Sequence, residues 1–141
     1  MIIKIMKLSS DAVVPKYAHD FEDACFDLVA TKKWYDDFGN TCYSFGLAFE
    51  IPHGFCGLLF PRSSNCKKSL LLSNSVGVID SCFRGEVSAV FKPTMIDGDE
   101  YKVGDRVAQM MIVPVPHVEF VLAEELSETS RGTNGYGSSG S

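Results

Sequence analysis

The sequence predicts one all-β domain of the barrel or sandwich type. Apolar and polar residues alternate with a period of two along residues 43–51 and again along residues 86–92, which is the pattern of a strand with one buried face. Turn sequences rich in glycine, proline and aspartate follow these runs at spacings typical of antiparallel strands, and not of alternating strands and helices. The length of 141 residues, of which 45% are hydrophobic, suits a single packed core and makes a second folded domain unexpected.

Three further segments complete the predicted elements. Residues 2–8 form a strand-like apolar stretch near the start of the chain. A single short helix is expected at residues 64–71, with Ser63 or Ser64 as its N-cap. Residues 107–115 are nearly all apolar, which is typical of a strand buried on both faces.

Charge and cysteine content exclude several classes of protein. A formal net charge of −5 argues against duplex DNA or an anionic membrane as a partner, because both bind dense patches of lysine and arginine. No apolar stretch approaches the roughly 18 residues of a membrane-spanning helix. The five cysteines are scattered without C-x-x-C spacing, so the sequence indicates neither a disulfide framework nor a zinc site. We therefore expect a cytoplasmic, or more broadly intracellular, protein that binds no nucleic acid and no membrane.

A candidate anion site lies at residues 61–65, Pro-Arg-Ser-Ser-Asn, where an apolar strand meets the expected helix. Backbone N–H groups and the dipole at the start of a helix attract anions. Arg62 is able to bridge two phosphate oxygens, and the hydroxyls of Ser63 and Ser64 add uncharged donors. A helix cap with a surface arginine explains the same residues, and the tripeptide alone favours that simpler explanation.

Two aspartates stand among apolar residues. Asp80 follows the apolar run 76–79, and partial burial at the end of a strand or hairpin suits a carboxylate that acts as a general base. Asp27 is framed by Phe26 and Leu28, which makes it a candidate for contacts with an arginine or with metal-bound water. Either acid, taken alone, is more often a turn or cap residue.

A turn at Gly104 leads into the apolar run 107–115. Asp105 and Arg106 in this turn are expected to form a structural ion pair. Gln109 is a polar side chain inside the run, and it therefore needs a hydrogen-bond partner.

The last eleven residues, 131–141, contain four glycines and three serines and cannot fold alone. Composition by itself favours a frayed terminus or a linker. Arg131 and Tyr136 favour instead a lid that orders over a ligand. Glycines allow backbone N–H groups to approach phosphate oxygens, while the arginine supplies charge and the tyrosine a stacking surface.

Five short segments in a fixed order resemble the motifs of the trimeric dUTP pyrophosphatase (dUTPase) family. They are residues 24–28, 61–65, 77–86, 104–109 and 131–140. The resemblance implies a β-barrel-like jelly roll over residues 1–130 and a flexible lid at 131–141 that closes on a neighbouring subunit's site. It also implies a homotrimer in which each site draws motifs from all three chains. The implied activity is hydrolysis of dUTP to dUMP and pyrophosphate, which limits uracil in DNA and supplies dUMP.

The same resemblance implies roles for individual residues. Asp80 would be the base that activates the attacking water, and Arg131 would act on the phosphates like an arginine finger. Asp27 would touch the waters of a Mg²⁺ ion that the substrate phosphates mainly hold. The triphosphate would be bound by Arg62, Ser63, Ser64, Gln109, Arg131, Ser138 and Ser139. Further substrate contacts, mainly to the base and sugar, would come from Asn74, Gly77, Val78, Ile79, Phe83, Tyr136 and Gly137.

Two other functions are compatible with such a scaffold. A dCTP deaminase shares the fold and an Arg-Ser-Ser segment but needs a glutamate on the strand after the third motif, where this chain has Val90. A catalytically silent nucleotide-binding regulator would need no acid at position 80. Cys82 stands where an aspartate is common in the family, whereas Phe83 and Tyr136 keep aromatic rings at their positions.

Overall fold

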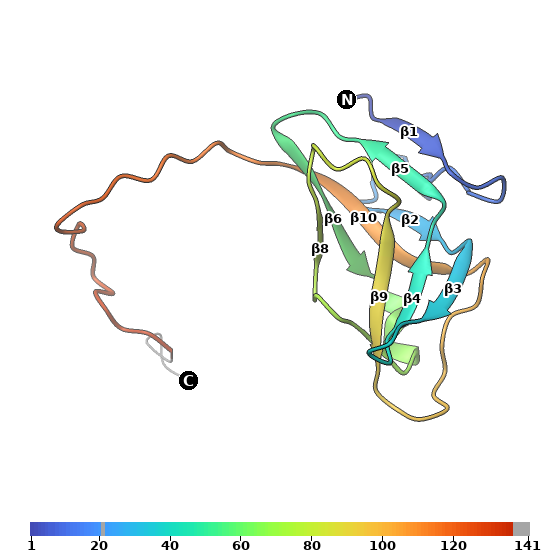
Figure 1. Ribbon diagram of the computed structural model, residues 1–141. Helices are drawn as coiled ribbons and strands as arrows, with labels where there is room; N and C mark the ends of the chain where they lie inside the picture. Colours follow the sequence, from blue (N-terminus) through green and yellow to red (C-terminus); the bar gives the residue numbers. More distant parts are fainter. Residues whose placement is uncertain (21, 137–141) are drawn as a thin grey trace.

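The computed structural model describes residues 1–20 and 22–136, and these fold almost entirely into β-strands (Figure 1). In chain order the elements are β1 (Lys4–Lys7), β2 (Phe26–Val29), β3 (Lys32–Tyr35), β4 (Thr41–Ser44), β5 (Leu47–Glu50), β6 (Phe55–Pro61), the 3-10 helix η1 (Ser63–Lys67), β7 (Leu70–Leu72), β8 (Gly77–Ile79), β9 (Ser88–Pro93) and β10 (Arg106–Pro114). The predicted all-β class is confirmed.

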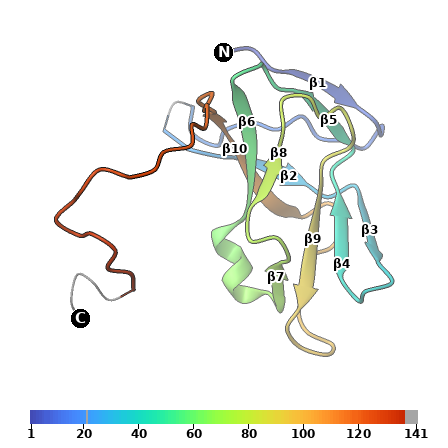
Figure 2. The same cartoon turned by 60° about the vertical axis from the view of Figure 1, so that its left-hand side comes forward.

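Two four-stranded sheets pack around a common core (Figure 2). One sheet has the strand order β2-β10-β6-β8 and the other the order β3-β4-β9-β7, while β1 and β5 form a separate pair. The pairings are antiparallel, and several join strands that are far apart in the chain, such as β2 with β10 and β4 with β9. These crossing connections between two packed sheets give the jelly-roll architecture that the resemblance implies.

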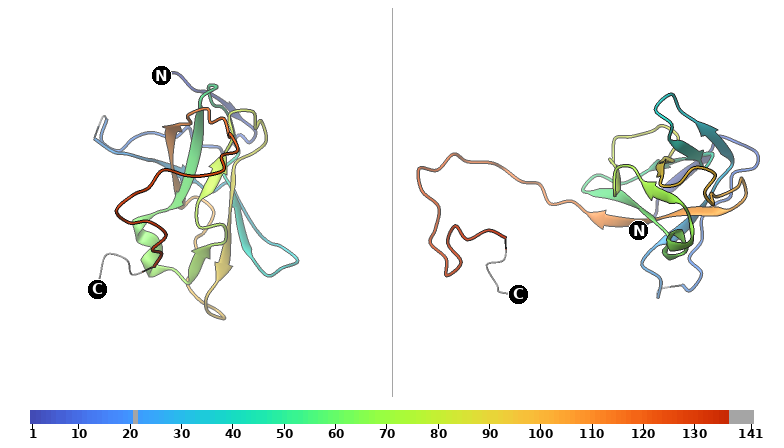
Figure 3. Two further views of the ribbon diagram at one scale, coloured as in Figure 1. Left: turned by 90° about the vertical axis from the view of Figure 1, so that its left-hand side faces the viewer. Right: turned by 90° about the horizontal axis from the view of Figure 1, so that it is seen from below.

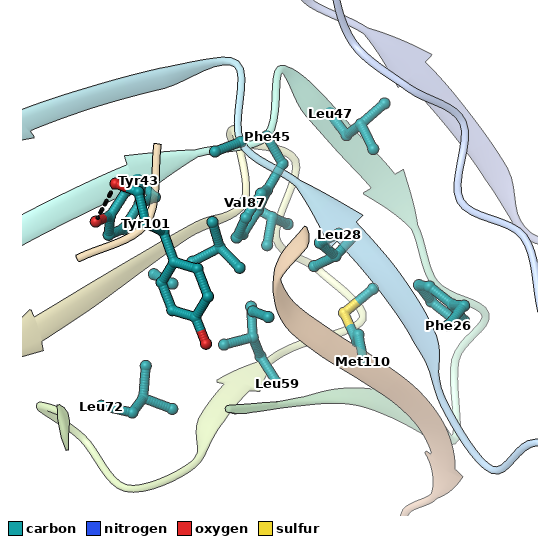
Figure 4. Packing of buried hydrophobic residues seen from close by; sticks show 14 of the residues in the cluster. Phe26, Leu28, Tyr43, Phe45, Leu47, Leu59, Leu72, Val87, Tyr101 and Met110 are labelled. Carbon is teal, nitrogen blue, oxygen red and sulfur yellow. Dashed lines mark hydrogen bonds between the residues drawn. The ribbon is translucent and has the colours of Figure 1, made fainter. Parts of the chain in front are cut away.

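The core lies between the two large sheets, and Figure 4 shows its side chains converging. Leu28 and Met110 from one sheet and Tyr43 and Phe91 from the other are essentially fully buried. The Tyr43 ring makes edge contacts with Phe91 and Tyr101, at centroid distances of 5.8 and 6.1 Å, and its hydroxyl donates to the Tyr101 carbonyl at 3.0 Å. Desolvation raises the pKa of Tyr43 far above its ordinary value, so this hydroxyl remains a neutral donor.

The single strand expected at residues 43–51 is in fact two strands separated at Gly46. Gly46 has a φ of +63°, and a Cβ there would lie 3.0 Å from the Cβ atoms of Ser9 and Ala12. The chain therefore bends at this point, so that β4 pairs in one sheet and β5 pairs with β1. Because both faces are covered, the alternating small residues such as Ser44 and Ala48 are buried as well.

The helix expected at residues 64–71 is wrong in type and length. Residues Ser63–Lys67 form a 3-10 helix that begins without a side-chain cap, and Leu70–Leu72 form β7. The segment ends early because Asn65 Nδ2 donates to the Leu70 carbonyl at 2.8 Å, while β7 pairs with β9. Tertiary pairing thus outweighs the local helix preference.

The strand expected at residues 107–115 is confirmed as β10, but only its first half is buried. Val107, Ala108 and Met110 have almost no exposed surface, whereas residues 111–113 are half-buried. In the other strand with clear alternation, β9, Ala89 and Phe91 point into the core as predicted.

Glu100 ties the hairpin formed by β3 and β4 to the loop before Tyr101. Its carboxylate lies 2.6 Å from Lys33 Nζ, accepts from Thr41 Oγ1 at 2.7 Å and accepts from the Tyr35 hydroxyl at 3.1 Å. Partial burial acts to raise the pKa of Glu100, but the hydrogen bonds from Lys33, Thr41 and Tyr35 outweigh it and hold the pKa below its ordinary value of 4.5.

We therefore expect Glu100→Gln to lower the free energy of unfolding at pH 7 by about 1 kcal/mol. A carboxyl whose pKa is lowered by folding stabilises the fold above its unfolded pKa, and this contribution disappears as pH falls through the folded pKa. Urea unfolding should show the difference between wild type and Glu100→Gln shrinking from about pH 5 downward. A difference that stays constant or grows on acidification would contradict this account.

Residues 115–136 continue from β10 as an extended arm that runs away from the sheets (Figure 3). Phe120 and Leu122 on this arm are almost completely exposed. Among the described residues, no helix is both long and apolar enough to cross a membrane.

Candidate functional site

A polar cleft of about 440 Å³ opens beside the ends of three neighbouring strands. One wall is the loop that precedes β2, and the other carries the ends of β6 and β10. The residues that line the cleft are Lys16, Ala18, His19, Asp23, Ala24, Cys25, Asp27, Arg62, Ser63, Arg106 and Gln109. Three permanent cations face two carboxylates here, so the cleft carries an excess of positive charge that suits an anion.

Strand register brings the predicted residues of three separate motifs together in this cleft. Gln109 on β10 stands opposite Asp27 on β2 and opposite Phe60 on β6, one residue from the Pro61 that precedes Arg62. Gln109 Nε2 donates to the Pro61 carbonyl at 3.0 Å, which is the partner that its position inside an apolar strand requires.

Arg62 is held in a fixed orientation by Asp27. Its Nε and Nη2 donate to the two Asp27 oxygens at 2.6 and 3.3 Å, and its Nη1 donates to Ser64 Oγ at 3.0 Å and to the Arg106 carbonyl at 3.4 Å. The expectation that Arg62 bridges two phosphate oxygens stays a prediction, and in this arrangement the fork of Arg62 is closed on Asp27. Of the five N–H groups of a guanidinium, these four contacts leave one.

The ion pair expected between Asp105 and Arg106 is also wrong. Arg106 Nη1 donates instead to Asp27 Oδ2 at 3.2 Å, and Asp105 Oδ2 accepts from the Lys102 amide at 2.8 Å. Asp105 thus caps its own turn, whereas Arg106 adds a second positive charge beside Asp27.

Four residues that line the cleft lie outside the motifs, namely Lys16, Ala18, His19 and Asp23, and two of these, Lys16 and His19, have side-chain nitrogen atoms. Lys16 and His19 lie on the loop before β2 and line the cleft opposite Arg62. The His19 amide donates to Asp23 Oδ2 at 2.7 Å, and this bond lowers the pKa of Asp23, while the His19 ring stands 3.3 Å from the same carboxylate. Neither residue has a spacing that would reveal it in the sequence, because only the path of the loop brings it to the cleft.

The Cys25 thiol adds no charge to the cleft. Desolvation raises the pKa of Cys25, and the nearby Asp27 carboxylate raises it further. A neutral thiol at position 25 is therefore compatible with the positive character of the cleft.

A second group of predicted residues lies along the outer strand β8 and the turn after it. Strand β8 is at the edge of its sheet, where it pairs only with β6, so one side of its backbone is available to a ligand (Figure 2). A Cβ at Gly77 would stand 3.2 Å from Leu59 Cβ and 3.6 Å from Asn74 Nδ2, so a side chain at position 77 would crowd Leu59 and contact Asn74. Val78 and Phe83 are largely exposed on this edge, whereas Ile79 is half-buried.

Asp80 begins the turn after β8, and its carbonyl accepts from the Phe83 amide at 3.1 Å. The expected partial burial of Asp80 at the end of the strand is wrong, because the residue is exposed. It lines a shallow pocket with His53, Cys82 and His117 and does not line the cleft of Arg62.

The remaining predicted residues lie on the arm. Arg131 is exposed, and its hydrogen bonds to described residues lie within the arm, from Nε to the Asn134 carbonyl at 3.0 Å and from Nη2 to the Gly135 carbonyl at 3.2 Å. Tyr136 is completely exposed. Gly137, Ser138 and Ser139 lie outside the described residues.

The described residues suit an anion better than a metal ion held by the protein alone. No group of three histidine, cysteine or carboxylate side chains among them is placed to hold a metal ion. Asp27 nevertheless has lone pairs beyond those that accept from Arg62 and Arg106, so it is able to bond to the water shell of a cation that arrives with a phosphate.

Comparisons with known proteins converge on one family. A family model described as dUTPase matches residues 11–140. The chain is 38% identical over 142 residues to a deoxyuridine 5'-triphosphate nucleotidohydrolase of Picosynechococcus sp., and 37% identical over 142 residues to one of Nautilia profundicola, with 99% of each chain covered in both cases. The structure of a Staphylococcus bacteriophage 80alpha dUTPase with dUPNHPP superposes with a TM-score of 0.87 at 25% identity and covers 99% of both chains.

Proposed function

This chain belongs to the dUTPase family, and we propose that its separate cleft and β8 edge form one dUTP-hydrolysing site when subunits assemble. The protein is a hydrolase of the deoxyuridine triphosphate nucleotidohydrolase type, converting dUTP to dUMP. The observation that carries the proposal is that the candidate site residues of one chain lie in two separate pockets. Asp27, Arg62 and Gln109 line the anion cleft, whereas the exposed Asp80 lines another pocket.

The cleft binds the triphosphate. Arg62 contributes its positive charge and its remaining N–H, and Ser63, Ser64 and Gln109 contribute polar groups without adding charge. Lys16 and Arg106 strengthen the positive field around them. The long-range attraction of such a field favours a polyanion over a nucleoside with fewer phosphates.

The β8 edge binds the uracil and the sugar. The free backbone side of Gly77, Val78 and Ile79, together with the Asn74 amide, offers donors and acceptors in the fixed spacing of a strand. A base edge that pairs with a strand is read by hydrogen bonds, and the Asn74 side chain, which lies close to Gly77, limits the size of the base. Phe83 lies against the deoxyribose, where a ribose hydroxyl would otherwise stand, and Tyr136 and Gly137 cover the base from the arm.

Asp80 acts as the base that takes a proton from the attacking water. Water attacks the α-phosphorus, the bond to the pyrophosphate oxygen breaks, and the proton of the water passes to the carboxylate. Asp80 is exposed in a single chain, so a neighbouring subunit must supply the dry surroundings and the phosphates. Arg131 then approaches the leaving phosphates from the arm, with Ser138 and Ser139 beside it.

Asp27 would contact the water shell of a Mg²⁺ ion that arrives with the nucleotide, through lone pairs that Arg62 and Arg106 leave open. Such an ion would neutralise part of the charge of the phosphates.

A homotrimer would bring together the three groups of substrate-binding residues that lie apart in a single chain. Cleft, β8 edge and arm each carry substrate-binding residues, yet in one chain they do not meet. The arm also carries large apolar side chains, Val118, Phe120 and Leu122, with no covering surface of their own. Exposed apolar groups of this size indicate an interface with another copy. In this assembly residues 1–130 form the β domain, and residues 131–141 are the lid on a neighbour's site.

The biological role follows from the reaction. Removal of dUTP limits the incorporation of uracil into DNA and supplies dUMP, and both processes belong inside the cell. A deaminase is not favoured, because Val90 on β9, which stands opposite Cys42 on β4, offers no group that transfers a proton.

The proposed function is tested by incubating the protein with Mg²⁺ and, separately, dUTP, UTP, dTTP and dCTP. We expect dUMP and pyrophosphate from dUTP and little product from the other three nucleotides. Release of ammonia from dCTP would indicate a deaminase instead. Binding of dUTP without turnover would indicate a silent regulator.

A further inference from the structure

Gly85 leaves room for the ring of Phe83 in the turn after β8. A Cβ built on Gly85 would lie 2.6 Å from Cζ and 2.9 Å from Cε2 of that ring, and the third nearest atom, at 3.4 Å, also belongs to the ring. Carbon atoms that are not bonded to each other pack at about 3.5 to 4.0 Å. The ring therefore occupies the space that any larger residue at position 85 would need.

The role of Gly85 differs from that of the turn glycines. Gly39, Gly54 and Gly104 have positive φ angles, and a Cβ on any of them would meet nothing within 4 Å. Those positions require glycine for their backbone conformation. Gly85 has no positive φ, so what it supplies is space.

The backbone of this turn is fixed more firmly than the ring. The Phe83 amide donates to the Asp80 carbonyl at 3.1 Å, and Arg84 Nη1 donates to the carbonyls of Ser81 and Phe83 at 2.6 and 2.9 Å. The Phe83 side chain, by contrast, is 43% exposed and is displaced more easily than the hydrogen-bonded backbone. A methyl group at position 85 would therefore displace the ring by about 1 Å before it displaced the turn.

We propose that Gly85 is a positioning residue that sets the place of the Phe83 ring and thereby the discrimination between deoxyribose and ribose. This inference rests on the proposed contact of Phe83 with the sugar. Rejection of a hydroxyl by shape requires that the excluding group hold its position, and errors of about 1 Å reduce selectivity strongly. Gly85 itself touches no substrate in this account and acts through Phe83.

The test compares wild type with Gly85→Ala, Phe83→Leu and the double variant. For each protein, kcat and KM are measured with dUTP and with UTP, together with the melting temperature, and the crystal structure of Gly85→Ala is determined. We expect Gly85→Ala to reduce the ratio of kcat/KM for dUTP to that for UTP by about tenfold. In the Phe83→Leu background the same change should have little further effect, because the ring that it displaces is gone.

Several results would overturn the inference. An unchanged sugar preference in Gly85→Ala, or equal effects of Gly85→Ala with and without the ring, would show that position 85 does not act through Phe83. A crystal structure with the ring in place and the turn shifted would show the same. If the wild type failed to hydrolyse dUTP, the proposed function would be wrong, yet the ring position in the Gly85→Ala crystal would still decide whether Gly85 positions Phe83.

Discussion

Replacement of Asp80 by asparagine is expected to reduce kcat for dUTP by about 10³-fold. Asparagine keeps the size of the side chain and the turn after β8 but cannot accept a proton from water. Asp80 is exposed and makes no ion pair among the described residues, so the substitution should leave the fold intact. Steady-state release of pyrophosphate from dUTP measures the effect, and calorimetry should show that the nucleotide still binds.

Asp97→Asn is the matched control for this substitution. Asp97 is also an exposed aspartate, it lies on a distant loop, and its φ of +54° is one that asparagine adopts readily. We expect Asp97→Asn to retain wild-type kcat. If Asp80→Asn kept more than about a tenth of the activity, another group would have to activate the water, since loss of a general base typically costs more.

Deletion of residues 131–141 is expected to reduce turnover of dUTP by about 10³-fold while the melting temperature stays close to that of the wild type. An arginine that reaches the phosphates late in the reaction stabilises the charge of the transition state. None of the described residues of this segment belongs to the core, and Arg131 bonds only within the arm. Arg131→Ala alone should reproduce most of the loss, whereas Glu128→Ala, which removes another exposed charge of the arm, should cost far less.

Mixing two inactive variants tests whether the sites are shared between chains. Asp80→Asn supplies an intact arm, and the deletion variant supplies an intact Asp80. After exchange of subunits, some mixed trimers contain a site with both parts, and activity should partly return. Mixed trimers that form, as seen by native mass spectrometry, but remain inactive would contradict the shared site, and the arm would then act within its own chain.

Much of the fold was predictable from local pattern. The alternation around Ala89 and Phe91 predicted a strand with one buried face, and β9 is that strand. The break at Gly46 was not predictable, because it depends on the approach of Ser9 and Ala12 from a distant segment. Likewise, Leu70 and Leu71, which were expected to end a helix, belong to β7. Their pairing with β9 offers backbone hydrogen bonds that a short isolated helix cannot match.

The candidate site divides in the same way. The motif residues Asp27, Arg62 and Gln109 do come together in one cleft. The sequence predicted an arginine contact for Asp27 but not which arginines make it. Arg62 closes its fork on Asp27, and Arg106 pairs with Asp27 and not with Asp105. Lys16 and His19 enter the cleft without any motif, and Asp80 stands apart and exposed.

The sequence by itself determined the all-β class and the set of candidate side chains that we propose bind an anion and a nucleotide. Periodicity and residue type are local properties, so they are visible without knowledge of the tertiary structure. Only the tertiary structure decided which charges neutralise each other and which remain for a ligand. Those choices depend on the register of β2, β6 and β10, strands that meet although long stretches of chain separate them. For the same reason, the separation of Asp80 from the anion cleft became visible only in the folded chain.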